Sequence, residues 1–591
     1  MNFSRLFDII DFQLRQYPQD KALSYYVEDA WRSFSLADCI THINSVSLMA
    51  MRSHWKKGDR VAFIFEKNTP YWNFIDFGLL QAGIVTVPIH ATSSAEEIIY
   101  ICRETEAVCL LVSGSGLRSK ISRVVQECPD LKEIGAIDNV PGLETWDGFH
   151  LRPDETESRL LQQVKDNISE QDLATIIYTS GTTGLPKGVM LSHLNIVSNI
   201  KASMTLIPVT PVHRVISFLP ISHAFERMVI YSYIAVGAAV YYAEQSELLD
   251  RIKSVQPHYL SAVPRFPERV YDIIIARARH QPRWVRWLVQ WAIRLGERYS
   301  PNRQLDPWYR TQLLFADLLI FRWWRKALGG YLKGVFVGAA ALNPKLGRLF
   351  TAAGIRIVEG YGLTETSPVV AFNRFEPGGT QFGTVGIVIP GLDVKIDAPN
   401  EAGEGEILVK GPNVMQGYYK HPEWTAEVMT DDGWLRTGDV GKFVKKRFLQ
   451  ITDRRKDIFK TTHGKYIAPQ SVENHLKTSP YINQCMIIGA NKPTIAALIV
   501  PDFNYLEQWC KEHGVHWTAP LYMVHNPMVV KKMNEVVAHL NESLSNLEKV
   551  KKIHLLPEEW SPESGELTPT LKNKRAVIEK KFAREVGDMF G

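Results

Sequence analysis

A loop rich in glycine and hydroxyl residues, followed by a lysine, is the part of this chain best suited to chemistry. It spans residues 178–188 and reads Tyr-Thr-Ser-Gly-Thr-Thr-Gly-Leu-Pro-Lys-Gly. Glycine lets the backbone approach a ligand closely, so successive N–H groups can point at an anion. Lys187 adds a compact positive charge suited to phosphate oxygens. The spacing differs from the Walker loop, and an ordinary turn would not need the Pro-Lys-Gly exit. We expect this loop to bind the polyphosphate of a nucleotide.

A second segment, residues 359–366, reads Glu-Gly-Tyr-Gly-Leu-Thr-Glu-Thr and follows the apolar pair Ile357-Val358, which predicts a loop at a strand end. Glu365 could hold a hard cation such as Mg²⁺, which prefers oxygen ligands and bridges to phosphates. Tyr361 offers a flat face for a base. Alone this segment is weak evidence, and it gains weight beside a phosphate loop.

Two further segments could complete such a site. In residues 434–441, Asp439 is flanked by glycines and could accept two ribose hydroxyls, although a simple β-turn aspartate has the same pattern. In residues 565–575, Lys572 stands in a Pro/Thr loop and could be a mobile catalytic cation. Read in isolation, such a lysine is more often a solvated surface charge.

The elements that must position these segments follow an α/β pattern. Short β-branched runs at residues 60–65, 107–112 and 334–338 are each followed by a stretch with helical spacing, which is typical of a mostly parallel sheet. Residues 174–178 predict a buried strand that leads into the phosphate loop. Residues 383–451 have the short strands and turns of an all-β section.

A basic cluster at residues 453–457 precedes a final α+β portion. We therefore expect a large N-terminal domain, residues 1–452, of α/β subdomains plus a β-rich section. A small mobile α+β C-terminal domain, residues 453–591, would carry Lys572.

Residues 277–326 differ from their surroundings, because ten Arg and one Lys face only three acidic residues, a net charge of +8. Trp284, Trp287 and Trp291 share one face of a predicted helix with Leu288 and Leu295. A basic, Trp-rich amphipathic helix suits an anionic lipid surface. The alternative is a helical insert whose tryptophans pack on the domain.

The composition of the chain argues against several classes of protein. The 591 residues are 45% hydrophobic and 22% charged with a net charge of +5, so nothing argues for nucleic acid. Six scattered cysteines fit a reducing compartment better than a disulfide framework. The N-terminus lacks a signal-peptide pattern, and the apolar residues 228–243 are too few for a spanning helix, so we expect buried core there. We expect a protein that is cytoplasmic or bound peripherally to the inner face of a membrane.

Together, the four segments resemble the adenylate-forming (AMP-binding) superfamily. The chain looks most like the long-chain fatty acyl-CoA synthetases within it. The marks of that group are Leu-Pro-Ile-Ser-His-Ala-Phe-Glu-Arg at 219–227, Thr-Asp-Arg-Arg-Lys-Asp at 452–457, Gly-Lys-Tyr-Ile-Ala-Pro-Gln at 464–470 and Leu-Thr-Pro-Thr-Leu-Lys at 567–572. The resemblance implies ATP-dependent activation of a long-chain fatty acid through an acyl-adenylate, with transfer to coenzyme A and release of AMP and pyrophosphate.

The resemblance also assigns residue roles. Catalytic contacts would come from Lys572, His223 at the acyl entry, and Glu365, with Thr182 and Glu365 holding Mg²⁺. The phosphates of ATP would contact Thr179, Ser180, Gly181, Thr182, Thr183, Gly184 and Lys187. Adenine would be framed by Gly338, Ala339, Ala340 and Tyr361, beside Gly362 and Thr364. Asp439 and Arg454 would bind the ribose, Lys456 would mark the hinge, and Gly464 would approach the pantetheine of CoA.

Two departures from the family pattern are visible. Ala339 stands where a second glycine is usual, and we expect nucleotide binding to survive the extra methyl group. Residues 445–447, Lys-Lys-Arg, replace an acidic-Gly turn and put the local turn geometry in doubt. Two alternatives stay open: an acyl-adenylate ligase that loads a carrier protein, and a catalytically inactive lipid-binding homologue. Chain-length preference and oligomeric state are not determined by the sequence.

Overall fold

The structure is a computed structural model. It describes residues 2–128, 131–138, 140, 143–180, 185–301, 306–454, 457–462, 466–546, 548–561, 564–567 and 573–590, with the backbone alone at 180, 454 and 466. The chain divides into two compact units. The first comprises residues 1–394, 409–436 and 445–449, and the second comprises 395–408, 437–444 and 450–591.

The first sheet of the first unit contains the strand that leads into the phosphate loop. Its order is β19-β9-β8-β4-β3-β5-β6-β7. The strands are β3 (Arg60–Phe65), β4 (Val85–Ile89), β5 (Cys109–Ser113), β6 (Glu133–Ala136), β7 (Glu144–Thr145), β8 (Leu173–Ser180), β9 (Pro186–Ser192) and β19 (Gly417–Tyr418). From β8 to β7 neighbouring strands are parallel, whereas β9 and β19 join antiparallel at the edge.

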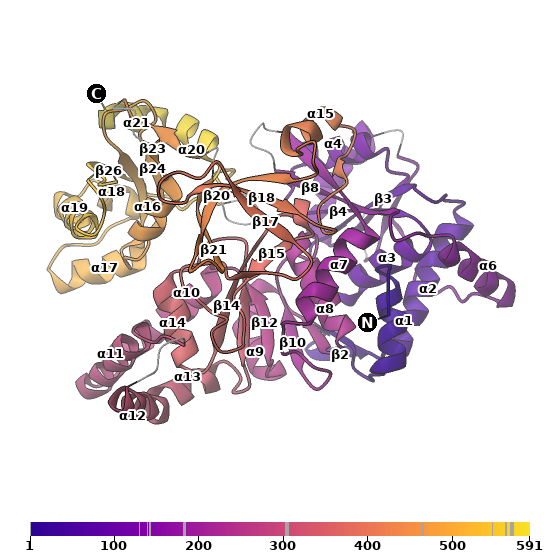
Figure 1. Cartoon of the computed structure of the whole chain (residues 1–591), viewed down its shortest axis with the longest axis horizontal. Helices are drawn as coiled ribbons and strands as arrows, with labels where there is room; N and C mark the ends of the chain where they lie inside the picture. The colour runs from indigo at the N-terminus through magenta and orange to yellow at the C-terminus, as the bar shows by residue number, and fades with distance from the viewer. Residues whose placement is uncertain are drawn as a thin grey trace. The chain divides into compact units, whose positions relative to one another are not determined.

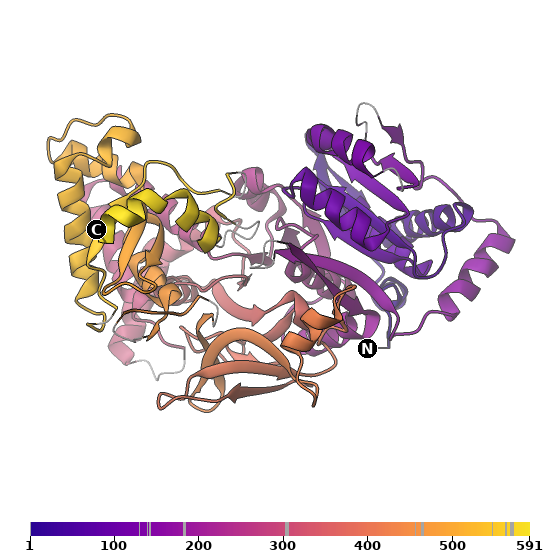
Figure 2. The ribbon, with the colours of Figure 1, turned by 90° about the horizontal axis from the view of Figure 1, so that it is seen from above.

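Helices cover both faces of the first sheet (Figures 1 and 2). The faces alternate because successive strand residues point to opposite sides: Ala62 and Ile64 of β3 pack with α4 (Ala95–Thr105) and α5 (Arg118–Glu127). On the other face Phe63 contacts Trp72 of α3 (Pro70–Gln81), which packs on α2 (Leu36–Arg52). The remaining helices of this part are α1 (Asp8–Gln16), α6 (Glu155–Asp166) and α7 (His193–Met204).

The second sheet has the order β16-β15-β14-β13-β12-β10-β11-β1-β2. Its strands are β1 (Leu23–Val27), β2 (Ala30–Phe34), β10 (Arg214–Ser217), β11 (Ala239–Tyr242), β12 (Tyr259–Ala262), β13 (Gly334–Val337), β14 (Arg356–Gly362), β15 (Val369–Phe372) and β16 (Ile387–Val388). The strands from β1 through β11, β10, β12 and β13 to β14 are parallel, and antiparallel strands close both edges. The predicted mostly parallel α/β architecture is therefore confirmed.

Several elements connect the strands of the second sheet. They are α8 (Ala224–Ala235), α9 (Leu248–Val255), α10 (Arg265–Arg279), α11 (Arg283–Glu297), α12 (Pro307–Ala316), the π-helical segment η3 (Asp317–Phe321), α13 (Arg322–Ala327) and α14 (Pro344–Ala352). The insert at 277–326 is helical, as predicted. Residues 228–243 are buried in α8 and β11, which also confirms the core prediction. No helix of the described residues is long and apolar enough to cross a membrane.

The β-rich section forms a sheet of β17 (Asp393–Asp397), β18 (Gly405–Lys410), β20 (Leu435–Val444) and β21 (Phe448–Arg454). It is not all-β, because α15 (Pro422–Val428) lies between β19 and β20, with Pro422 at its first position. The turn between β20 and β21 places Lys445 and Lys446 at φ +51° and +56°. A non-glycine residue pays about 1–2 kcal/mol for this left-handed conformation, so the unusual turn forms at a local cost.

In the second unit, β24 (Ile482–Ile488), β25 (Ala496–Pro501) and β26 (Lys552–Leu555) form a sheet between two helical layers. Cys485 and Ile487 face the cluster of α16 (Pro469–Leu476), α17 (Phe503–Glu512), α18 (Pro520–Met523) and α19 (Pro527–Asn541). Met486 and Ile488 face α20 (Arg575–Lys581) and α21 (Ala583–Phe590). A small sheet pairs β22 (Phe459–Lys460) with β23 (Tyr466–Ile467). All six cysteines of the chain are described and buried, and none of them forms a disulfide bond.

Candidate functional site

The residues on either side of the predicted phosphate loop belong to two paired strands. β8 and β9 pair antiparallel, with Tyr178 opposite Gly188 and Thr179 opposite Lys187. The predicted strand before the loop is confirmed. The chain leaves the loop on a strand, so Lys187 is held by the hairpin register and by no helix N-terminus. Gly181, Thr182, Thr183 and Gly184 lie outside the described residues, as does the side chain of Ser180.

Tyr418 connects the lysine of the phosphate loop to the carboxylate of the second segment. The Nζ of Lys187 lies 4.9 Å from the ring centre of Tyr418 and 4.8 Å from that of Trp424. The Tyr418 hydroxyl donates a hydrogen bond to Glu365 Oε1 at 2.9 Å. Burial, together with Glu365, raises the pKa of Tyr418 well above its usual value, so the phenol keeps its proton and donates. The structure therefore brings together Lys187 and Glu365, as a nucleotide site with a cation requires.

Backbone pairing holds Tyr418 in this place. β19 pairs with β9, so that Tyr418 lies opposite Val189. The Met415 N–H donates to the Glu365 carbonyl, and the Tyr419 N–H donates to the Gly188 carbonyl. The sequence analysis missed Tyr418 and Trp424, because no local pattern shows that residues 417–424 return to a strand so distant in sequence.

Parallel strands explain why the other candidate residues gather at one edge. β10, β12, β13 and β14 run in the same direction, so their carboxyl ends meet at one edge of the second sheet. His223 follows β10, Gly338 follows β13 and Glu365 follows β14. The His223 and Gly338 segments touch, because a Cβ atom on Gly338 would lie 3.2 Å from the Phe225 ring. The carboxyl edge is where ligands bind in open α/β sheets.

The second segment is partly strand. β14 extends through Gly362, so Gly360, Tyr361 and Gly362 do not belong to a loop, and the turn begins only at Leu363. The predicted loop is wrong for these three residues and for Glu359, which also belongs to β14, because β14 gains an antiparallel partner in β15 beyond the parallel sheet. A Cβ atom on Gly362 would lie 1.9 Å from the carbonyl oxygen of Pro368, so only glycine fits there. Thr364 is buried beside Glu365.

Ala339 takes the conformation that its family position implies. It follows Gly338 with a φ of +70°, where glycine would be free of strain. This conformation costs alanine about 1–2 kcal/mol. Ala340 and Leu342 continue this loop, and the Leu342 N–H donates to the buried carboxylate of Glu359 at 2.9 Å. Burial raises the pKa of Glu359 to about 7.

His223 is the N-cap of α8, and its Nδ1 accepts from the Phe225 N–H at 3.4 Å. Helix α8 is fixed by Arg227, which is 1% exposed and forms a bidentate ion pair with the buried Asp76 of α3. The Nη1 of Arg227 also donates to Thr175 of β8 at 2.8 Å. The helix behind His223 is thus tied to the strand that enters the phosphate loop. The sequence analysis quoted Arg227 within a motif without giving it this role.

Asp439 and Arg454 lie on neighbouring strands of the β-rich sheet, in the second unit. Asp439 is a buried strand residue of β20, so its predicted turn is wrong, although Gly438 beside it has a φ of +72°. Its N–H donates to Thr437 Oγ1, which in turn donates to the Ile407 carbonyl. The side chain of Arg454 lies outside the described residues, as do Lys456, Gly464 and Lys572.

The residues that flank Lys572 in sequence are well anchored. Leu567 and Asn573 pair through an antiparallel bridge. Arg575 donates to Glu473 at 2.6 Å and to the Ile487 carbonyl at 3.1 Å. Glu473 is buried in α16 and Ile487 belongs to β24, so the ion pair fixes the start of α20 to α16 and the second bond fixes it to the sheet.

Comparisons with known proteins agree with this geometry. Residues 10–419 match the family model of AMP-binding enzymes, and residues 456–591 match that of the AMP-binding enzyme C-terminal domain. The chain is 32% identical to the long-chain-fatty-acid–CoA ligase FadD15 of Mycobacterium bovis, over 95% of this chain and 92% of that protein. It is also 32% identical to human long-chain-fatty-acid–CoA ligase 1, over 95% of this chain and 82% of that one.

Solved structures show the same fold at lower identity. The adenylation domain of a carboxylate reductase from Mycobacterium chelonae superposes with a TM-score of 0.76 at 20% identity, covering 99% of this chain and 91% of that one. ATP-bound MatB from Rhodopseudomonas palustris superposes with a TM-score of 0.70 at 21% identity, covering 98% and 99%. The two family models together span most of the chain, and the chain belongs to the AMP-binding enzymes, among the long-chain-fatty-acid–CoA ligases of that family.

Proposed function

We propose that this protein activates long-chain fatty acids with ATP and transfers the acyl group to coenzyme A. The fatty acid carboxylate attacks the α-phosphate, the bond to the β-phosphate breaks, and pyrophosphate leaves. The CoA thiolate then attacks the acyl carbonyl and AMP leaves. The observation that supports this proposal best is the grouping of Lys187, Tyr418 and Glu365, because a bound polyphosphate with its cation needs a positive charge and a carboxylate side by side.

The residues around Glu365 fit a magnesium ion. The Tyr418 hydroxyl donates a hydrogen bond to Oε1 of Glu365. Oε2 of Glu365 accepts no hydrogen bond among the described residues, so Oε2 is available to a cation. The described residues contain no group of three or more His, Cys, Asp or Glu side chains that could hold a metal by themselves. Mg²⁺ suits this donor set, since it binds through one or two carboxylates plus substrate phosphates and water. When bound, it would neutralise charge on the phosphates.

The other roles follow the family motifs. We assign Thr182 with Glu365 to the cation, Lys187 and residues 179–184 to the phosphates, and Gly338–Ala340 with Tyr361 to adenine. We assign Asp439 and Arg454 to ribose and Gly464 to CoA. Lys572 would stabilise negative charge on the α-phosphate.

His223 borders the acyl entry as an N-cap whose ring is already oriented by the Phe225 N–H. This role needs no proton transfer from the imidazole. None of the assigned residues acts as a nucleophile, so the chain would contribute binding, orientation and electrostatic stabilisation.

Product analysis tests the proposal. The full chain is incubated with ATP, Mg²⁺ and acids of graded chain length from butyrate to oleate, with and without CoA. We expect AMP and pyrophosphate in equal amounts, acyl-CoA only when CoA is present, and rates that rise with chain length. ADP and phosphate as products, or turnover confined to short acids, would contradict the proposal.

The acceptor is tested separately. A holo-acyl carrier protein replaces CoA in the same assay, and we expect little transfer to it. Efficient transfer to the carrier with none to CoA would instead identify a carrier-loading ligase, and absence of any adenylate would identify an inactive homologue.

A further inference from the structure

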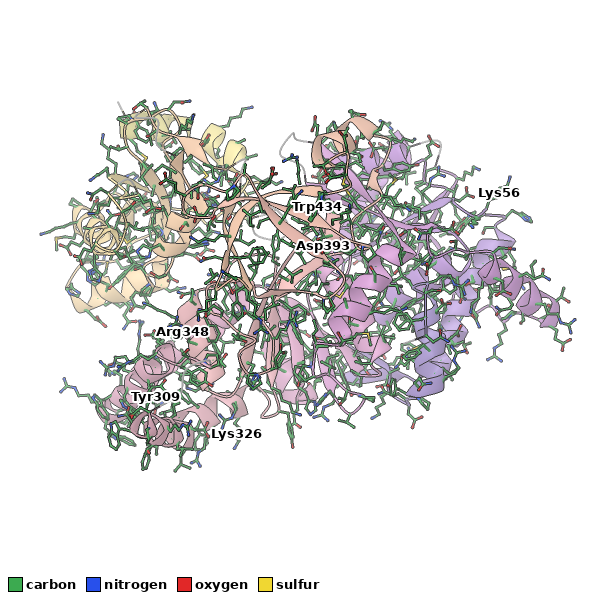
Figure 3. The ribbon with its side chains drawn as sticks, viewed as in Figure 1. Lys56, Tyr309, Lys326, Arg348, Asp393 and Trp434 are labelled. Atoms are coloured by element: carbon green, nitrogen blue, oxygen red, sulfur yellow. The ribbon has the colours of Figure 1, made fainter. Side chains whose placement is uncertain are left out.

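The helical insert between β12 and β13 exposes an apolar surface that the proposed reaction does not use. α12, η3 and α13 follow one another without a break from Pro307 to Ala327. Together with α11 and α14 they enclose a small core, to which Tyr309 adds a hydrogen bond from its hydroxyl to the Leu295 carbonyl at 2.8 Å. Figure 3 labels Tyr309 and Lys326, near the two ends of this run.

The run is apolar on two opposite faces. One face packs into the small core with Ala316, Ile320, Phe321 and Trp324. The other face is exposed and consists of Trp308, Leu314, Phe315, Leu318, Leu319 and Trp323. Trp308 is 68% exposed and Leu314 is 72% exposed. A helix that is hydrophobic all round is normally buried, so this second face requires a partner.

α11 adds two more exposed tryptophans. Its buried residues include Val289, Ala292 and Ile293. Trp284 and Trp287 are 67% and 58% exposed. The alternative in which these two tryptophans pack on the domain is therefore wrong. Trp284 and Trp287 therefore face water, whereas Leu288 and Trp291 of the same predicted face are half-buried and pack on the small core.

Basic side chains surround the exposed aromatic residues. Arg283, Arg286 and Arg294 of α11 are exposed, and none has an acidic partner within the part of the chain that the structure describes. Arg322 and Lys326 lie 5.2 Å and 5.7 Å from the ring centre of Trp323. The net charge of residues 277–326 is +8, against +5 for the whole chain, so the remainder sums to −3. The positive charge of the protein is concentrated in this insert.

We infer that the insert surface, formed by Trp284, Trp287, Trp308, Leu314, Phe315, Leu318, Leu319 and Trp323 with the arginines around them, docks on an anionic lipid bilayer. Tryptophan and arginine suit the interfacial zone, where the ring enters the acyl boundary and the guanidinium stays with the headgroups. A second copy of this chain fits poorly, because a symmetric pair would place the same positive surface against itself. The inference goes beyond the proposed reaction and holds whether or not the proposed activity is correct.

Vesicle co-sedimentation of the full chain, without ATP or fatty acid, tests the inference. We expect binding to vesicles of phosphatidylglycerol and phosphatidylcholine, weakened by salt, and little binding to pure phosphatidylcholine. Each basic residue near an anionic surface raises the partition coefficient onto the membrane roughly fivefold. The triple variant R283Q/R286Q/R294Q should therefore lower the partition coefficient onto these vesicles by about 100-fold. W284S/W287S and F315S/L318S should each lose binding to the same vesicles even at low salt.

A matched control uses another exposed apolar pair, Leu521 and Tyr522, which are 56% and 69% exposed in the second unit. L521S/Y522S should bind vesicles like the wild type. Because all these side chains are exposed, circular dichroism and thermal unfolding should be unchanged in every variant. Equal sedimentation of the wild type and the insert variants would overturn the inference. The inference would also be overturned if the wild type did not bind vesicles but associated with itself, and if the insert variants abolished that self-association.

Discussion

At the scale of single residues, Tyr418 determines how Glu365 presents its carboxylate. The Tyr418 hydroxyl donates a hydrogen bond to Glu365 Oε1, and the Tyr418 ring lies beside the Lys187 ammonium group. A hydrogen bond that orients a metal-binding group is typically worth 10- to 100-fold in metal affinity or activity. If Glu365 holds Mg²⁺ as we propose, Tyr418 is a positioning residue, and its contribution should be visible in the dependence on Mg²⁺.

We expect Tyr418→Phe to raise the Mg²⁺ concentration needed for half-maximal adenylation by about 10-fold or more. The KM for the fatty acid should stay the same, because the ring remains in place. ATP–pyrophosphate exchange measured over a magnesium titration gives both values. Tyr419→Phe is the matched control, since among the described residues the Tyr419 hydroxyl has no hydrogen-bond partner. Identical magnesium curves for both variants would show that Tyr418 does not position Glu365.

At the scale of elements, helix α8 depends on a buried ion pair. Arg227 reaches Asp76 of α3 and Thr175 of β8, and both charged groups are almost fully buried. Removing one partner of such a pair leaves a buried charge without compensation, which costs about 3–5 kcal/mol. Replacing both by apolar residues avoids that cost. The pair therefore matters more for fixing α8 against the hairpin strand than for net stability.

We expect Arg227→Met to lower the free energy of unfolding by about 3–5 kcal/mol and Asp76→Leu in the same chain to restore most of it. Urea unfolding followed by tryptophan fluorescence measures both changes. Arg159→Met is the control, because Arg159 and its partner Glu155 are both exposed, so breaking this pair should cost at most about 1 kcal/mol. If Arg227→Met cost no more than the control, or if the double variant gave no recovery, this account of α8 would be wrong.

Helices and strands could be predicted from the sequence where the spacing of their apolar residues forms a local pattern. The strands at 60–65 and 334–338 and the helical insert lie where the sequence patterns put them, because alternation and helical spacing depend on neighbours in sequence. α15 was missed inside a section of short strands, since its seven residues give too few turns for a helical pattern.

At the scale of the whole molecule, the same chain must carry out two steps in turn, adenylate formation and thioester formation. We propose a boundary near residue 453, which the start of the C-terminal family model at residue 456 supports. In this proposal Lys572 serves adenylate formation, and a hinge at Lys456 permits the change to thioester formation. The two residues should therefore have reciprocal defects.

We expect Lys572→Ala to slow adenylate formation by about 10²–10³ while sparing thioester formation from supplied acyl-adenylate. Lys456→Pro should do the opposite, because proline fixes φ and limits rotation at the hinge. ATP–pyrophosphate exchange reports the first step, and acyl-CoA formation from the adenylate reports the second. Lys574→Ala is the control for the first variant. A large loss in Lys574→Ala with none in Lys572→Ala would move the catalytic assignment by two residues.

By itself, the sequence determined the strand before the predicted phosphate loop, the mostly parallel α/β class and the charge of the insert. Each depends on residue type and short-range spacing. The tertiary structure decided which distant residues meet. Tyr418 reaches Glu365 across 53 residues, and Arg227 reaches Asp76 across 151, because strand order brings them together. It also decided that Trp284 and Trp287 face water while Trp291 of the same predicted face packs on the insert core, because burial depends on where neighbouring helices lie and helical spacing alone does not show that.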